Sequence, residues 1–96
     1  MNMNYSVVWE DDGVSDRLQH IEHLFENAGE AVAVKANNKV SSATDLLSAS
    51  PYMGVGWSGK GRRLNIPALK ISLFYSVDDE MKEVRISRML HNSIRL

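Results

Sequence analysis

Two long helical patterns follow one another in this sequence with a single glycine, Gly29, between them. Apolar side chains recur every three or four residues on either side of that glycine, which places them along one face of each helix. Because glycine suits the left-handed conformation that ends a helix, we predict helices over residues 14–27 and 30–48. Such a short connection is expected to pack them as an antiparallel hairpin. The expected inward-facing residues are Val14, Leu18, Ile21 and Phe25, with Leu24 at the edge, and Val32, Ala36, Val40, Ala43 and Leu47.

Strand patterns flank the predicted helix pair. Residues 5–9 are short, β-branched and aromatic, which favours an opening strand. Pro51 ends the second helix, and a glycine-containing loop follows over residues 52–61. Three further strands are expected, at residues 62–66, 70–77 and 83–91. Hairpin connections make these strands antiparallel, so the order β-α-α-β-β-β predicts an α+β fold with the helix hairpin packed on one face of an antiparallel sheet.

Length and composition restrict the class of protein. At 96 residues the chain is expected to form a single domain over residues 1–96. Its net charge of −1 gives little long-range attraction for nucleic acid or anionic lipid. The absence of cysteine excludes disulfides and thiolate sites. With neither a membrane-length apolar run nor a secretory signal pattern, we expect a cytoplasmic protein that binds no membrane.

Four segments carry a resemblance to a known family. They are residues 5–9 with the acidic stretch that follows them, residues 47–54 (Leu-Ser-Ala-Ser-Pro-Tyr-Met-Gly), residues 61–66 leading to 74–77, and residues 84–93 (Val-Arg-Ile-Ser-Arg-Met-Leu-His-Asn-Ser). In this order they resemble the ParE/RelE superfamily of bacterial type II toxins. The last segment is similar to the arginine-any-leucine-histidine-any-serine ending of ParE-type members. The resemblance implies a toxin encoded beside an antitoxin that wraps around it and neutralises it.

The resemblance leaves two molecular targets open. ParE-like members inhibit DNA gyrase, whereas RelE-like members cut mRNA on the ribosome. Ser72 stands where RelE-like members often carry arginine, and the basic catalytic segment after the last strand is absent. Together with the low net charge, these departures favour the ParE-like branch, which has no established nuclease chemistry. The alternatives are a ribosome-dependent mRNA endonuclease and a degenerate toxin that only binds its antitoxin.

Six residues are candidates for partner binding under this resemblance: Trp57, Arg62, Arg63, Arg88, His91 and Asn92. If the chain is a nuclease, the candidate catalytic residues are Arg62, Arg63, Arg88 and His91. Neighbouring residues alternate across a strand, so one arginine of the pair at 62 and 63 is expected to face the helices and the other to face outward. The outward one would meet an acidic partner, or else serve solubility or pair with the Asp11 and Asp12 carboxylates. Trp57 is either an exposed anchor for a protein partner or a lid on the sheet.

The last strand carries two residues with alternative roles. Arg88 is expected on the same strand face as Val84, Ile86 and Leu90, where an arginine needs either a salt bridge or an exit to water. His91 is either an acid–base group or a structural hydrogen-bonding residue.

Two further patterns admit a functional and a plain interpretation. The glycines of residues 54–61 lack a Walker pattern, and a strand follows them, so a connecting loop is favoured over a phosphate loop. His20 and His23 have a spacing that could hold a metal, but their helical angles place them opposite the apolar face, which favours solvated side chains. We therefore expect no metal and no cofactor.

Overall fold

The computed structural model describes residues 4–93. In chain order the elements are β1 (Ser6–Trp9), α1 (Asp11–Ala28), α2 (Glu30–Ala49), β2 (Val55–Gly56), β3 (Arg62–Ile66), a short 3₁₀ helix (Pro67–Leu69), β4 (Ile71–Asp78) and β5 (Glu83–His91). The predicted order is confirmed, and most bounds agree within a residue. The exceptions are α1, which begins three residues earlier than predicted, and the two-residue β2, which lies in the predicted loop.

The five strands form one sheet in the order β1-β5-β4-β3-β2. Strands β2 to β5 pair with their neighbours in antiparallel fashion, as the hairpin connections require. β1 joins β5 in parallel, with Val7 opposite Val84. The α+β class is therefore confirmed, but the sheet is mixed rather than wholly antiparallel. The hairpin rule does not apply to β1, because almost the whole chain separates it from β5.

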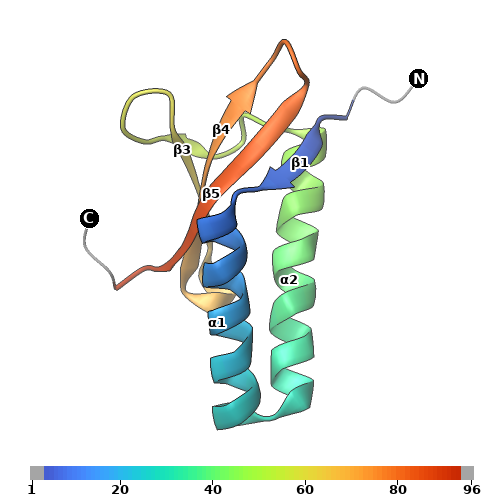
Figure 1. Cartoon of the computed structure of the whole chain (residues 1–96), viewed down its shortest axis with the longest axis vertical. Coiled ribbons are helices and arrows are strands. Elements are labelled where there is room, and N and C mark those ends of the chain that lie inside the picture. Colours follow the sequence, from blue (N-terminus) through green and yellow to red (C-terminus); the bar gives the residue numbers. More distant parts are fainter. Residues whose placement is uncertain (1–3, 94–96) are drawn as a thin grey trace.

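Gly29 ends α1 and begins α2 within one residue. Its φ of 95° lies in the region that favours glycine. Its N–H donates to the carbonyls of Leu24 and Phe25 at 3.1 and 3.2 Å, and its own carbonyl accepts the N–H of Ala33 at 3.1 Å. These bonds satisfy backbone groups at both helix ends, and the helices run side by side in opposite directions (Figure 1).

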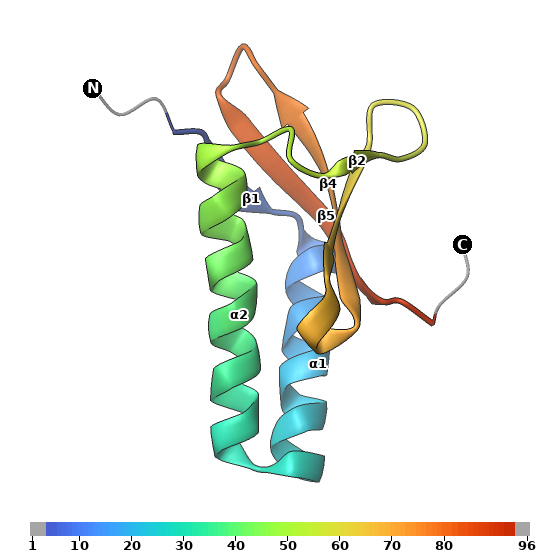
Figure 2. The ribbon, with the colours of Figure 1, turned by 180° about the vertical axis from the view of Figure 1, so that it is seen from behind.

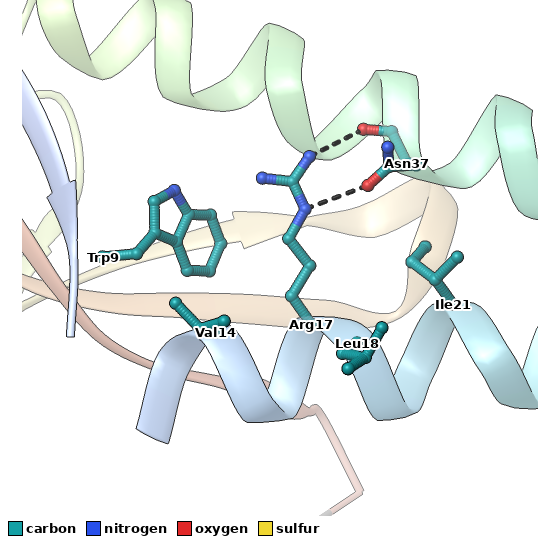
Figure 3. Close-up of a pocket in the computed structure, with 6 residues that line it drawn as sticks. All are labelled: Trp9, Val14, Arg17, Leu18, Ile21 and Asn37. Atoms are coloured by element: carbon teal, nitrogen blue, oxygen red, sulfur yellow. Dashed lines mark hydrogen bonds between the residues drawn. The ribbon is translucent and has the colours of Figure 1, made fainter. Parts of the chain in front are cut away.

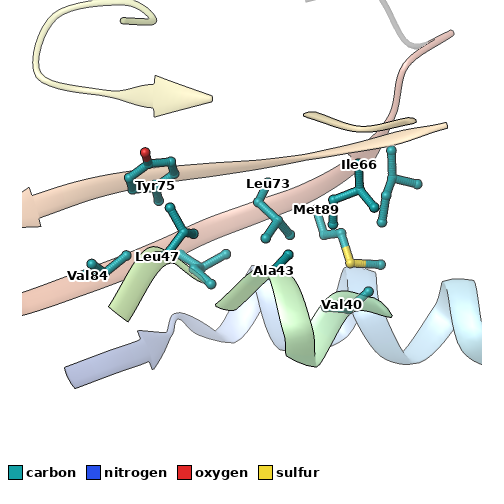
Figure 4. Packing of buried hydrophobic residues seen from close by; sticks show 10 residues of the cluster. Val40, Ala43, Leu47, Ile66, Leu73, Tyr75, Val84 and Met89 are labelled. Atoms are coloured by element: carbon teal, nitrogen blue, oxygen red, sulfur yellow. The ribbon is translucent and has the colours of Figure 1, made fainter. Parts of the chain in front are cut away.

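The core lies between α2 and the sheet. Figure 4 shows Val40, Ala43 and Leu47 of α2 pointing at the inner face of the strands. The buried cluster consists of Val40, Ala43, Leu47, Ile66, Ile71, Leu73, Tyr75, Val84, Ile86 and Met89. The predicted inward residues of α2 are confirmed except Val32, which is 45% exposed while Ala33 beside it is buried.

The predicted apolar face of α1 is largely solvent-exposed, which corrects the sequence-based expectation. Val14, Leu18 and Phe25 are 51%, 57% and 56% exposed. No residue of α1 belongs to the core cluster, and Gly13 is the one buried residue of this helix. The reason is that α1 packs beside β5 and against α2 instead of lying over the sheet. The end of the helix hairpin also projects beyond the strands, as the reverse view shows (Figure 2).

Neither helix within residues 4–93 is long and apolar enough to cross a membrane.

Candidate functional site

The face of the sheet turned away from the helices, here called the open face, carries a cluster of polar and aromatic side chains from β3, β4 and the loop before β3. The β3–β4 register places Arg63 opposite Phe74 and Asn65 opposite Ser72. Because side chains alternate along a strand, these residues share the face opposite to the buried Leu73 and Tyr75.

Trp57 packs back onto this face from the loop between β2 and β3. Its ring lies edge-on to Phe74, with centroids 5.5 Å apart and planes at 64°. The Arg63 guanidinium carbon lies 5.8 Å from the Trp57 ring centroid. The loop therefore folds over the sheet, and Trp57 remains 39% exposed.

A hydrogen-bond network fixes Arg63 on the open face. Its Nε donates to Ser72 Oγ at 2.9 Å, and that hydroxyl donates to Asn92 Oδ1 at 2.7 Å. The amide nitrogen of Asn92 donates to Asn65 Oδ1 at 2.9 Å. Because Ser72 is only 1% exposed, a buried hydroxyl holds the guanidinium of Arg63 in place. Asn92 and Arg63, both predicted site residues, are thus brought together.

Two hollows lie side by side on the open face. The smaller, of about 80 Å³, is lined by Trp57, Arg63, Ser72, Phe74, Leu90, His91 and Asn92. The larger, of about 240 Å³, is lined by Trp57, Gly61, Arg62, Phe74, Tyr75, Ser87, Arg88 and Leu90. The side chains of Trp57, Phe74 and Leu90 border both hollows.

Arg62 has its polar contacts away from the small hollow, in the loop that follows α2. One guanidinium nitrogen donates to the carbonyls of Tyr52 and Gly54, at 2.9 and 2.6 Å. The guanidinium carbon lies 5.2 Å from the Tyr52 ring centroid. Arg62 therefore clamps backbone carbonyls of the loop. The outward-facing arginine of the pair is Arg63, and the ion pair with Asp11 or Asp12 that was one expected alternative for it is not among the salt bridges of the described residues.

Arg88 does not share a face with Val84 and Ile86, which corrects the expectation. The β4–β5 register shifts between Phe74 and Tyr75, pairing Phe74 with Arg88 and Tyr75 with Ile86. Ser87 is the extra residue of this β-bulge, and the bulge inverts the alternation that follows it. Met89 is buried as a result, while Leu90 lines the hollows of the open face.

Asp16 of α1 holds Arg88 by two hydrogen bonds. Arg88 donates through Nε and a terminal nitrogen to the two carboxylate oxygens, at 2.7 and 3.1 Å. The same carboxylate accepts the backbone N–H of Met89 at 3.0 Å. The hydrogen bond with Asp16 raises the pKa of Arg88. Arg88 is thus a structural ion-pair partner that also borders the larger hollow.

His91 reaches the small hollow with a defined tautomer. Its Nδ1 accepts the backbone N–H of Ser93 at 3.2 Å and lies 2.7 Å from the Ser93 hydroxyl oxygen. A neutral imidazole that accepts at Nδ1 carries its proton on Nε2. His91 is therefore a hydrogen-bond donor through Nε2 when neutral.

His20 is half-buried, so the expectation of a solvated side chain is wrong for it. Its Nε2 is buried without a hydrogen-bond partner. Burial lowers its pKa, and the charges of His91 and His23 lower it further. His23 is exposed, as expected, and its ring pairs with Asn27. Within residues 4–93 no group of three or more histidine, aspartate or glutamate side chains is placed to hold a metal.

A second candidate site, which the sequence did not predict, is a groove between α1 and α2 beside β1. This helix groove has a volume of about 440 Å³ and is lined by Trp9, Val14, Arg17, Leu18, Ile21 and Asn37. Figure 3 shows Arg17 crossing it from α1 to Asn37 of α2. The apolar residues of α1 that were predicted to face the core, Val14, Leu18 and Ile21, line this groove instead.

Arg17 ties the two helices together inside the helix groove. Its Nε donates to Asn37 Oδ1 at 3.0 Å, and a terminal nitrogen donates to Ser41 Oγ at 2.9 Å. Its guanidinium carbon lies 5.0 Å from the Trp9 ring centroid. Burial lowers the pKa of Arg17. Because an arginine guanidinium is not deprotonated in proteins, the apolar wall of the groove carries a fixed positive charge.

Comparison with known proteins identifies the fold. No protein-family model and no curated protein matches the sequence. Among solved structures, the chain is similar to one from the chromosomal ParDE toxin–antitoxin system of P. aeruginosa, with TM-score 0.77, 21% identity, and coverage of 93% of this chain and 97% of that one. It is also similar to the RelBE2 toxin–antitoxin complex of Mycobacterium tuberculosis, with TM-score 0.64, 18% identity, and coverage of 92% and 98%. A chain of the E. coli RelBE complex matches with TM-score 0.58, 14% identity, and coverage of 95% and 99%. The protein therefore has the fold of the ParE/RelE superfamily of toxins.

Proposed function

We propose that this chain is the toxin of a bacterial type II toxin–antitoxin system, neutralised by a cognate antitoxin protein and acting by inhibition of DNA gyrase in the cytoplasm. The observation that supports the toxin assignment most strongly is the fold, which matches a chain of a ParDE system over nearly the full length of both chains. The four sequence segments that resemble such toxins support it independently.

The helix groove supports an antitoxin partner. An apolar patch of several side chains on a small domain marks a protein contact more often than free solvent-facing surface. Val14 and Leu18 are both more than half exposed and stand beside Arg17. An amphipathic helix that presents apolar side chains in this groove would bury them, as in other helix-in-groove complexes.

The open face favours gyrase over the ribosome as the target. Metal-free RNA cleavage needs several catalytic groups converging on one phosphate. Of the four candidates for a nuclease, Arg62 is held by loop carbonyls and Arg88 by Asp16. The other two candidates, Arg63 and His91, line the same small hollow. With a net charge of −1, the chain also has little electrostatic attraction for rRNA.

Induction of the chain in a bacterial host tests the toxin assignment. We expect growth arrest that co-expression of the protein from the neighbouring reading frame relieves. Absence of arrest, with binding to that protein intact, would instead identify a degenerate toxin that only binds its antitoxin.

A supercoiling and DNA-cleavage assay with purified gyrase tests the target. We expect the free toxin to inhibit supercoiling and the antitoxin to restore it. Unimpaired supercoiling in the presence of a toxin preparation that arrests growth would overturn the gyrase proposal.

An mRNA endonuclease is the second candidate, because Arg63 and His91 share the small hollow. Primer extension on cellular mRNA after induction would then show cuts in register with codons. Growth arrest without such cuts would remove this candidate.

A further inference from the structure

We propose that the contact between α1 and the end of β5 is an acid-sensitive joint, in which protonation of His20 releases α1 from the sheet while the core stays folded. The chain has three histidines, and all three gather at this joint: His20 and His23 of α1 and His91 of β5. Clusters of histidine are a common device for switching a protein contact in mild acid. The inference goes beyond the toxin function and depends on neither its target nor its antitoxin.

The contacts of Asp16 place His20 beside β5. Asp16 accepts the backbone N–H of Met89 at 3.0 Å and two hydrogen bonds from Arg88. Residues four apart on a helix lie on the same face, so His20 stands one turn beyond Asp16 along the same contact. The charge of His91 acts on His20, which agrees with an imidazole near the end of β5.

The surroundings of His20 suit a neutral imidazole and not a charged one. Its Nε2 is buried and has no hydrogen-bond partner among the described residues. An imidazolium carries a proton on both ring nitrogens, so protonation would place an unpaired, charged N–H inside this contact. Burial lowers the pKa of His20, and the charges of His91 and His23 lower it further.

The charged groups around His20 belong to α1 and β5. They are His91 and Arg88 on β5, and His23 and Asp16 on α1. Among the described residues, neither a carboxylate nor any group of α2 contributes to the pKa shift of His20, and Asp16 is already bound to β5. An imidazole ordinarily takes up a proton near pH 6.5, so mild acid collects like charges at the joint.

The fold allows α1 to part from β5 without opening the core. The core cluster joins α2 to the sheet and contains no residue of α1. A histidine whose pKa is lowered on folding stabilises the fold above its ordinary pKa, and that contribution is lost as the pH falls below about 6.5. Because the buried group is His20, the loss is expected at the α1–β5 contact and not in the core.

Amide hydrogen exchange of the full chain, followed by NMR at about pH 7.5 and about pH 5 and corrected for intrinsic rates, tests the proposal. We expect α1 to lose at least about tenfold more protection than α2 at the lower pH, the factor that one pKa unit represents. Unchanged protection of α1 overturns the proposal. Equal loss in α1 and α2 also overturns it, because the whole domain would then be opening.

A titration of the imidazole resonances in the same protein identifies the group that acts. The protonation of His20 is expected over the same pH range as the loss of α1 protection. Opening of α1 at a pH where His20 stays neutral overturns the role of this histidine. This measurement uses the wild-type chain, so it decides the question even if a variant fails to fold.

Two variants separate His20 from its neighbour. His20→Gln keeps a neutral polar side chain that takes up no proton, so α1 protection should no longer change between the two pH values. His23→Gln is the matched control, because His23 is exposed and its ring pairs with Asn27, and it should keep most of the change. The same loss of α1 protection in His20→Gln and wild type overturns the proposal, and so does equal behaviour of the two variants.

Discussion

At the scale of single residues, close packing explains why a glycine, Gly54, stands in the loop that leaves α2. Its N–H donates to the buried Tyr75 hydroxyl at 3.0 Å. A Cβ at this position would stand 2.6 Å from both that hydroxyl and the carbonyl oxygen of Arg63. The requirement is one of space, because the loop passes directly over β3 and the end of the Tyr75 side chain.

Gly54→Ala is therefore expected to destabilise the protein by about 1–3 kcal/mol, the usual cost of forcing extra volume into a packed site. Gly56→Ala is the matched control, since a Cβ there meets nothing within 4 Å. Urea denaturation of both variants would check this. Equal free energies of unfolding for the two variants would contradict the close approach at Gly54.

Asp79 holds two tyrosines at the β4–β5 turn, and this makes stability depend on pH. Tyr5 and Tyr52 donate to its two oxygens at 2.7 and 2.5 Å. The Tyr52 and Tyr5 hydrogen bonds lower the pKa of Asp79. The bond to Asp79 raises the pKa of Tyr5 to about 12.

A lowered carboxyl pKa stabilises the fold above the ordinary pKa of aspartate, and the contribution is lost as pH falls through the lowered value. A raised tyrosine pKa stabilises the fold below about 10, and that contribution is lost as pH rises toward 12. Melting temperatures of wild type and Asp79→Asn across pH should therefore differ most near neutrality and converge in acid. A difference that persists unchanged in acid would contradict the role of the carboxylate.

At the scale of elements, α1 is held by polar contacts where the sequence predicted apolar ones. The pairing of β5 with β1 ends at Ile86. Beyond that point the carboxylate of Asp16 accepts the backbone N–H of Met89, as the carbonyl of a neighbouring strand would. Arg17 joins α1 to α2 through Asn37 and Ser41. These contacts turn the apolar side chains of α1 outward and leave them free to form the helix groove.

Arg17→Ala is expected to destabilise the protein by about 1–3 kcal/mol, because it leaves half-buried acceptors on α2 without their charged donor. Arg85→Ala should cost much less, since that arginine makes solvent-exposed ion pairs. Thermal unfolding of both variants measures the difference. If the two variants melt at the same temperature, Arg17 does not hold the helices together.

At the scale of the whole molecule, α1 contributes to the fold without entering the core. The core cluster joins α2 to the sheet, and the helix groove lies between the two helices beside β1, where Trp9 of its lining also packs against that cluster. A partner bound in the groove would cover apolar surface that the chain cannot bury by itself.

A cognate antitoxin is therefore expected to raise the melting temperature through linkage, with a gain of about 2.7 kcal/mol when its free concentration is a hundred times Kd. Leu18→Glu should weaken this binding, because it introduces a charge into the groove. Met81→Glu is the matched control, since Met81 is 68% exposed and lines no described groove. A melting curve unchanged by saturating antitoxin would contradict the partner proposal.

Local patterns in the sequence were sufficient for the order of the elements and for most of their bounds, the start of α1 being an exception. Glycine at 29 and proline at 51 act on their own neighbours, and apolar periodicity is a property of a short window. The alternation across β3 was likewise enough to separate Arg62 from Arg63, and Arg63 lies on the open face.

The sequence by itself determined that this chain is two helices in a hairpin followed by a meander, because backbone preference and side-chain spacing act over a few residues. Only the tertiary structure decided which face of α1 meets solvent, how β1 joins β5, and that Arg63, His91 and Asn92 share one hollow. Each of these depends on contacts between residues far apart in the chain, such as Asp16 with Met89 and Ser72 with Asn92. The bulge at Ser87 shows the same cause, since one extra residue in β5 between the partners of Phe74 and Tyr75 moves Arg88 to the open face and Met89 into the core.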